Sequence, residues 1–139
     1  MTDAGAFDGV IAAIKFNADG LVPAIAQADG SGEILMMAWM NRDAVLETLI
    51  TGRVCYWSRS RGGLWRKGET SGQVQRLKDF RVDCDGDTLL LLVEQDGVAC
   101  HTGRRSCFYR AIRDGNLEVI QGVETDPSVL YGHGHNAGH

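Results

Sequence analysis

The sequence predicts a single-domain α+β fold that is rich in β-structure, with a curved mixed sheet or pseudo-barrel and a few short helices. Three observations support this. Glycine is frequent (18 residues) and proline rare (2), which suits many short elements joined by tight turns. Strand-like apolar runs outnumber helix-like ones, and glycines within such runs favour sheet curvature. The 139 residues, 44% of them hydrophobic, suffice for one core that buries roughly two-thirds of the unfolded surface.

The N-terminal part is predicted to begin with a short helix over residues 8–14. Apolar runs over residues 21–27 and 33–39 then read as strands. They flank the segment 29–32, whose sequence Asp-Gly-Ser-Gly is typical of a turn.

A longer helix is predicted between Asn41 and Thr51. Asn41 is a suitable N-cap, and Gly52 can close the helix in the left-handed conformation. One apolar stripe is formed by Val45, Leu46, Leu49 and Ile50. This segment is the clearest helix signal in the chain.

The remainder reads mainly as strands and turns. Strands are predicted over residues 53–58, 76–82, 88–94 and 106–113. Asp96-Gly97 is expected to form the hairpin turn between the last two strands. We expect a single domain over residues 1–131 and a frayed tail over residues 132–139, whose histidines are His133, His135 and His139.

Charge and composition narrow the class of protein. The formal net charge of −4 argues against a nucleic-acid partner, whose phosphates a basic surface would neutralise. No apolar run approaches the roughly 20 residues of a membrane span, and the acidic N-terminus does not resemble a secretory signal. We therefore expect a cytoplasmic protein. In a reducing compartment its four cysteines favour metal binding or catalysis over disulfides.

The segment Asp83-Cys84-Asp85-Gly86-Asp87 is the densest cluster of metal-ligating residues. In an extended backbone its three carboxylates would point to one side and Cys84 to the other. Carboxylate oxygens suit Mg²⁺ or Ca²⁺, whereas a thiolate suits Zn²⁺. The alternative is a solvated acidic turn that leads into the next strand.

Cys100 and Cys107 are a second pair of candidate zinc ligands. They are too far apart for a C-x₂-C knuckle, so a common site requires tertiary or quaternary assembly. Three thiolates around zinc leave one position for a water molecule, which is the catalytic arrangement; a fourth ligand from Cys55 or His101 would make the site structural. Cys55 lies in a strand-like segment where a buried, inert cysteine is ordinary, so it is left out of the predicted site.

His101 adjoins Cys100 and is the single histidine outside the predicted tail. Its unperturbed pKa of about 6.5 suits proton transfer at neutral pH. The alternative is a polar loop histidine without a function. Its position between two candidate ligands favours the functional interpretation.

A basic cluster covers residues 58–61 and 64–72. Closely spaced cations, hydroxyls and glycines can hold a phosphate through charged hydrogen bonds and backbone N–H groups. The alternative is a solvated basic hairpin. Trp57 and Trp65 can stack on a purine or belong to the core.

Taken together, four ordered blocks resemble the phosphoribosyl-AMP cyclohydrolase family: residues 57–61, 64–72, 83–87 and 100–108. The resemblance covers about residues 32–110. It implies hydrolytic opening of the adenine ring, at the N1–C6 bond, in N1-(5-phosphoribosyl)-AMP, a step of histidine biosynthesis. The chain resembles the monofunctional form of the family.

The resemblance also implies an obligate homodimer with two kinds of metal. Zinc would be held by Cys84 of one subunit with Cys100 and Cys107 of the other, and would activate the attacking water. Magnesium would be held by the three aspartates of the acidic segment: Asp83, Asp85 and Asp87.

The mechanism that we infer for such a hydrolysis assigns roles to the remaining site residues. His101 or Glu69 would transfer protons. Candidate substrate-binding residues are Arg59, Arg61, Trp65, Lys67, Arg104 and Arg105. A rival hypothesis is a zinc-stabilised module that binds a nucleotide or a partner without catalysis.

Overall fold

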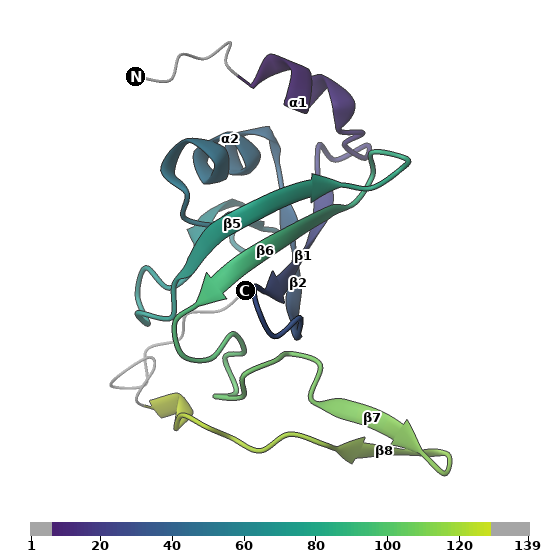
Figure 1. Ribbon diagram of the computed structural model, residues 1–139, viewed down its shortest axis with the longest axis vertical. Coiled ribbons are helices and arrows are strands. Elements are labelled where there is room, and N and C mark those ends of the chain that lie inside the picture. Colours follow the sequence, from purple (N-terminus) through teal and green to yellow (C-terminus); the bar gives the residue numbers. More distant parts are fainter. Residues whose placement is uncertain (1–6, 129–139) are drawn as a thin grey trace.

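The computed structural model describes residues 7–128 and has one curled mixed sheet, two short helices and a separate two-stranded hairpin (Figure 1). The helices are α1 (Asp8–Ala13) and α2 (Arg42–Thr51). The strands are β1 (Val22–Ala28), β2 (Ile34–Met40), β3 (Cys55–Ser58), β4 (Gly63–Arg66), β5 (Gln75–Val82), β6 (Leu89–Gln95), β7 (Arg110–Arg113) and β8 (Asn116–Val119). The predicted β-rich α+β class with a curved mixed sheet is confirmed.

The large sheet has the strand order β4-β3-β2-β1-β6-β5. The neighbouring strands β1 and β6 are parallel, and all other neighbouring pairs are antiparallel. The connection between β1 and β6 therefore includes β2, α2, β3, β4 and β5. The segments that precede and follow β6 therefore lie at opposite ends of the sheet.

The core lies between the sheet and α2. Alternate residues of β1, from Val22 to Ala28, are fully or almost fully buried and pack with Ala44 and Val45 of α2. The predicted capping of α2 is confirmed: the Asn41 side chain accepts a hydrogen bond from the backbone N–H of Ala44, at 2.8 Å, and Gly52 is left-handed.

The predicted apolar stripe of α2 is partly wrong. Ile50 is 52% exposed, whereas the polar Thr48 is buried. The Thr48 hydroxyl takes the inner position because it bonds both the N–H and the carbonyl of Cys55, at 2.9 and 3.2 Å. A buried hydroxyl with two backbone partners is well accommodated, which periodicity of apolar residues does not reveal.

The predicted hairpin at Asp96-Gly97 is also wrong. After Gly97 the chain leaves the large sheet and forms a loop, because the N–H of Val98 donates to the Gln73 side chain instead of to a strand. The second hairpin joins β7 to β8 through Asp114 and Gly115, whose φ angles are 51° and 80°. Two consecutive left-handed residues match the type I′ turn that an Asp-Gly pair favours.

Two further predictions concern the tail and membrane-spanning segments. The predicted tail, residues 132–139, lies outside the described residues. Within residues 7–128, neither helix has the length and apolar character that crossing a membrane requires.

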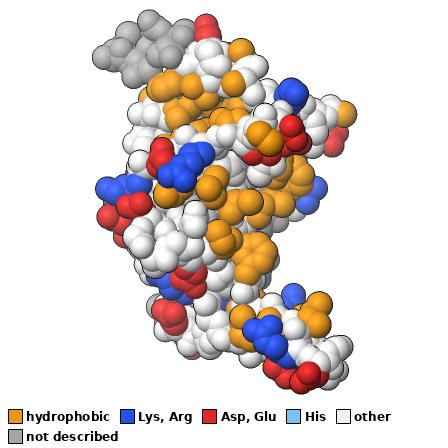
Figure 2. Space-filling model, turned by 45° about the vertical axis from the view of Figure 1, so that its right-hand side comes forward, with side chains coloured by type: hydrophobic (Ala, Val, Ile, Leu, Met, Phe, Trp, Pro, Cys, Tyr) orange, Lys and Arg blue, Asp and Glu red, His pale blue; other side chains and the backbone are white. Residues whose placement is uncertain are grey.

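The sheet face opposite the helices carries partly exposed hydrophobic side chains. Register places Ile25 beside Met37 of β2 and Leu90 of β6, and Trp39 beside Trp57 of β3. Met37 is 44% exposed. Figure 2 shows hydrophobic side chains gathered in the middle of the molecule, above the β7–β8 hairpin.

Candidate metal centre and substrate site

Cys100 and Cys107 are brought together by the loop over residues 99–107, which we call the thiol loop. The loop folds back on itself: the N–H of Ala99 donates to the carbonyl of Arg105, and that of Cys100 to the carbonyl of Arg104, at 3.0 and 3.1 Å. The two thiols then meet in a side-chain hydrogen bond. The predicted pairing of these two residues is therefore present within one chain.

The hydrogen bond between the thiols separates their acidities. It lowers the pKa of Cys100 to about 5 and raises that of Cys107, which donates the proton. The Thr102 hydroxyl donates a second hydrogen bond to the Cys100 sulfur, at 3.0 Å, and the charge of His101 lowers the pKa of Cys100 further. At neutral pH the pair therefore includes a thiolate, the form of cysteine that binds soft metals.

Lys67 lies under the thiol loop and is 5% exposed. Its ammonium group donates a hydrogen bond of 2.8 Å to the carbonyl of Ala99. Burial lowers the pKa of Lys67 to about 8, while Cys107 and Cys100 act in the opposite direction. The structure thus places this predicted phosphate ligand in the interior, beside the thiols.

Arg104 and Arg105, also predicted phosphate ligands, attach the thiol loop to other segments. Arg105 forms an ion pair with Glu33, at 2.7 Å. Arg104 donates to the carbonyl of Gln121, at 2.8 Å, and its guanidinium lies 4.1 Å from the centre of the Tyr109 ring. Both side chains therefore have partners within this chain that hold the loop in place.

The acidic segment forms a turn and not the extended chain predicted from the sequence. The chain reverses at Gly86, which has a φ of 76° and donates to the carbonyl of Asp83. Side chains consequently do not alternate between two faces. A hydrogen bond between the carboxyl groups of Asp83 and Asp87 raises the pKa of Asp87. The alternative interpretation, an exposed turn before a strand, describes the geometry correctly.

Cys84 is far from the other two predicted zinc ligands. It precedes β6, whereas Cys100 and Cys107 follow that strand. Seven residues of strand span roughly 23 Å at about 3.3 Å per residue. Among residues 7–128, no three His, Cys, Asp or Glu side chains gather closely enough to hold a metal ion. A single copy therefore presents the zinc ligands as a pair at one end of β6 and a single thiol at the other.

Cys55 belongs to the core and not to the thiol loop. It is fully buried in β3, and burial raises its pKa to about 12, with a further contribution from Glu47 of α2. All four cysteines are free thiols. The expectation that Cys55 is an ordinary buried cysteine agrees with this position.

Arg59 and Arg61 of the basic hairpin β3–β4 each border a hollow. Arg59 stacks on Trp39, 4.8 Å from the ring centre, beside a surface hollow of about 550 Å³. Other residues that line it include Met37, Trp57, Ser58 and Ser60. Arg61 borders a smaller hollow of about 80 Å³. Trp65 packs on the buried Tyr56, with ring centres 5.5 Å apart.

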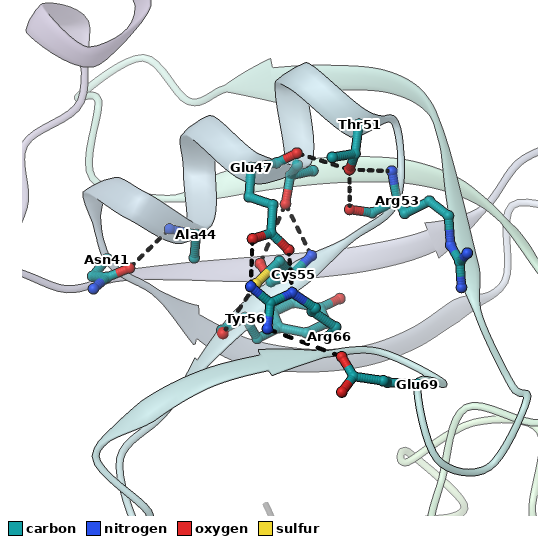
Figure 3. A network of polar contacts seen from close by, with 10 residues as sticks. Asn41, Ala44, Glu47, Thr51, Arg53, Cys55, Tyr56, Arg66 and Glu69 are labelled. Atoms are coloured by element: carbon teal, nitrogen blue, oxygen red, sulfur yellow. Dashed lines mark hydrogen bonds and ion pairs between the residues drawn. The ribbon is translucent and has the colours of Figure 1, made fainter. Parts of the chain in front are cut away.

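The two predicted proton-transfer residues lie in different surroundings. Glu69 is exposed and lies 4.0 Å from Arg66, whose guanidinium donates two hydrogen bonds to Glu47 of α2 at 2.7 and 2.8 Å (Figure 3). His101 is exposed on the thiol loop, next to Cys100. Of the two, His101 is the one that shares a loop with the thiols.

Two neighbours of the thiols were missed by the sequence analysis. Thr102 could have been found, because a hydroxyl two residues from Cys100 can reach its sulfur. Tyr56 could not: it is distant in sequence, yet it lies near Cys107 in the fold, and its complete burial raises the pKa of its hydroxyl. Only the folding of β3 against the thiol loop brings them together.

Known proteins of one family match most of the chain. Residues 36–109 match the family model described as phosphoribosyl-AMP cyclohydrolase. The phosphoribosyl-AMP cyclohydrolase of Paramagnetospirillum magneticum is 71% identical over 122 residues, 88% of this chain and 92% of the relative. That of Rhodospirillum centenum is 65% identical over 127 residues, 91% of this chain and 96% of the relative. The chain therefore belongs to the phosphoribosyl-AMP cyclohydrolase family.

Proposed function

We propose that this protein hydrolyses N1-(5-phosphoribosyl)-AMP by opening the adenine ring at the N1–C6 bond. The product would be the formimino-aminoimidazole carboxamide ribotide intermediate of histidine biosynthesis, formed in the cytoplasm. The observation that carries the proposal is the convergence of Cys100, Cys107 and His101 on one loop, in a chain that belongs to this family. Two thiols for a metal and an imidazole for a proton are what such a hydrolysis uses.

The thiol loop fits zinc. Its two thiols interact, one of them has a lowered pKa, and the Thr102 hydroxyl donates a hydrogen bond to that sulfur. Cys84 would complete a three-thiolate set. When bound there, zinc would supply a Lewis acid that makes a water molecule acidic near neutral pH.

We propose that the zinc ligands come from two copies of the chain. Within one copy Cys84 and the Cys100–Cys107 pair lie at opposite ends of β6. Two copies that stack the same sheet face with antiparallel β6 strands would bring each Cys84 to the thiol loop of its partner. A homodimer that binds zinc this way has two equivalent sites.

The outer sheet face supports such a homodimer. Parallel strands are normally covered on both faces, but the outer face of β1 and β6 is left partly exposed, with Ile25, Leu90 and Leu92 on it. The five-residue apolar run over residues 89–93 is typical of a strand that is buried on both faces. A second copy would bury this surface.

The acidic turn is the proposed magnesium site. Its carboxylates are exposed and close in sequence, and Mg²⁺ is commonly bound through one or two carboxylates while it keeps several waters. Asp83 and Asp87 already approach one another, and Asp85 lies at the tip of the same turn. In the proposed dimer this turn would face the substrate at the partner's thiol loop.

The remaining side chains would bind substrate and move protons. His101 would accept or donate a proton at the reacting amidine, since it is exposed beside the thiols. Arg59 would pair with a phosphate at the hollow that it shares with Trp39, where the indole can contact a base. Arg61 is the second phosphate candidate, on the same hairpin.

The central test combines metal analysis with the ring-opening assay. Cys100→Ala and Cys107→Ala should each abolish zinc retention and the absorbance change on incubation with phosphoribosyl-AMP. Cys55→Ser is the matched control, because its thiol is buried elsewhere, and it should keep both. Activity in zinc-free protein would end the hydrolase proposal. Loss of zinc in Cys55→Ser would favour the rival, zinc-stabilised binding module.

Sharing between subunits is tested by mixing two inactive variants. Cys84→Ala and Cys107→Ala proteins should regain activity when their subunits exchange, because one site of each mixed dimer is intact. A mixture of Cys100→Ala with Cys107→Ala is the control and should stay inactive, since both changes damage the same loop. Exchange without recovery in the first mixture would place all the ligands within one chain.

A further inference from the structure

Lys67 is an unusual side chain for this fold. Among the Lys and Arg residues that the structure describes, it is the single buried one. A buried cation is unfavourable unless a negative group accompanies it. Yet no carboxylate within residues 7–128 forms an ion pair with Lys67. The negative charge that makes the burial of Lys67 favourable must therefore come from a group other than a carboxylate.

The groups that face the Lys67 ammonium are few. It donates to the carbonyl of Ala99, the residue just before Cys100, at 2.8 Å. The indole of Trp65 lies 5.5 Å from it. Cys107 and Cys100 are the titratable groups that act on it electrostatically. The negative partner of Lys67 is therefore the thiol pair.

The backbone holds Lys67 rigidly in this position. Its N–H donates to the carbonyl of Val54, at 3.1 Å. The next residue, Gly68, is left-handed with a φ of 81°, and a Cβ there would overlap the backbone nitrogen of Val74. The chain around Lys67 is thus fitted closely between neighbouring segments, so the ammonium is aimed before any metal arrives.

We propose that Lys67 is a positioning residue of the zinc site: it tethers the thiol loop through Ala99 and offsets the charge of the metal–thiolate group. This inference rests on the proposed function. Zinc with three thiolates carries a net charge of about −1, from the charges of the metal and its deprotonated ligands, and one ammonium neutralises it. Lys67 therefore serves the metal and not the substrate phosphate.

The test is a series of Lys67 variants compared by zinc affinity. Lys67→Met removes the tether and the charge, Lys67→Gln keeps a donor without the charge, and Lys67→Arg keeps both. Loss of a group that supports metal ligands typically weakens metal binding by about 10–100-fold. By chelator competition on the full chain, we expect this loss of zinc affinity in Lys67→Met, a smaller loss in Lys67→Gln and the smallest in Lys67→Arg.

Lys78→Met is the control for this series. It lies at an exposed position of β5 and should bind zinc as the unmodified protein does.

A spectroscopic measurement separates the charge from simple loss of structure. In the cobalt-substituted protein, a nearby cation stabilises the thiolate electrons and raises the energy of the sulfur-to-cobalt charge-transfer band. The band should move to longer wavelength in Lys67→Met and Lys67→Gln, but not in Lys67→Arg or Lys78→Met. If Lys67→Met fails to fold, Lys67→Gln against Lys67→Arg decides the role of the charge.

The outcomes distinguish this inference from the proposed function. Unchanged affinity and an unmoved band in the neutral Lys67 variants, with zinc still lost in Cys100→Ala, would overturn the role of Lys67 alone. If the unmodified protein binds zinc no better than Cys100→Ala does, the zinc site itself is wrong. In that case the phosphoribosyl-AMP assay shows whether the activity survives without it.

Discussion

The two ends of β6 carry the two candidate metal sites and are built in different ways. At one end the thiol loop is attached to distant parts of the chain: Arg105 to Glu33, and Cys107 to Leu35. At the other end the acidic turn is held mostly by bonds among its own residues, such as that from the N–H of Asp87 to the Asp83 carboxylate.

This difference matches the chemistry that each end would perform. A site that holds zinc for catalysis benefits from ligands that are fixed before the metal binds, and long-range contacts fix them. Magnesium keeps much of its water and tolerates an exposed set of carboxylates. The contrast predicts that substitutions in the thiol loop reduce stability and zinc binding most. Substitutions in the acidic turn should have smaller effects that are confined to that end of β6.

Gly103→Ala should have the largest effect. Gly103 has a φ of 85°, and a Cβ there would overlap the carbonyl oxygen of Thr125. The carbonyl of Gly103 also accepts the N–H groups of Glu124 and Thr125. We expect a loss of about 3 kcal/mol in the free energy of unfolding, together with weaker zinc binding. Gly115→Ala, with a φ of 80° and nothing within 4 Å of its Cβ, is the control for the backbone conformation alone. Equal losses in the free energy of unfolding in Gly103→Ala and Gly115→Ala would contradict the predicted overlap with Thr125.

Gly86→Ala should damage the acidic end less and leave the thiol loop intact. A Cβ at Gly86 would overlap the carbonyl oxygen of Ala13, at the end of α1. The expected loss is about 2 kcal/mol in the free energy of unfolding, since the clash adds to the left-handed conformation. Gly20→Ala has nearly the same φ, 75°, and open space, so it should cost less. Alkylation of Cys100 should proceed as in the unmodified protein; a changed rate would mean that the two ends are coupled within one chain.

Thr102→Val tests the acidity of the thiol loop. Without the hydroxyl, the Cys100 thiolate loses a hydrogen bond, so its pKa should rise above about 5. A bond to a charged group contributes about 1.5 kcal/mol, which corresponds to roughly one pKa unit. The rate of alkylation of the metal-free protein against pH measures this shift. Thr102→Ser keeps the hydroxyl and should restore the original profile, whereas a shift in that variant too would argue against the hydrogen bond.

Asp87→Asn should have the smallest effect on stability, and it should make the folded protein more stable. The pKa of Asp87 is raised above its usual 3.8 by its hydrogen bond with Asp83, so the folded protein binds a proton there more readily than the unfolded chain does. The favourable contribution is complete below pH 3.8 and is lost as the pH rises through the folded pKa. At pH 7 the variant should therefore melt slightly higher than the unmodified protein.

Adding magnesium tests the same repulsion between the carboxylates of the acidic turn. Mg²⁺ should raise the melting temperature of the unmodified protein by relieving repulsion between the carboxylates, and should raise that of Asp87→Asn less. Near pH 3 the difference between the two proteins should disappear. A lower melting temperature for Asp87→Asn at pH 7 without magnesium would contradict the repulsion.

The elements that the sequence predicts well are those whose signals are local. The helix from Asn41 to Gly52 begins with an N-cap bond and ends in a left-handed glycine, both visible in the sequence. The hairpin at Asp96-Gly97 had an equally local signal but is wrong, because the Gln73 side chain takes the N–H of Val98. The Asp114-Gly115 turn carries the same signal and does form the hairpin.

The sequence by itself determined the family and the β-rich class, because these depend on residue identity and short-range patterns. Only the tertiary structure decided which of the candidate site residues meet. It set Lys67 beside the thiols, placed Glu69 4.0 Å from Arg66, and separated Cys84 from Cys100 by the length of β6. The physical reason is that such contacts are fixed by strand order and burial, which join segments far apart in sequence and leave no pattern within either one.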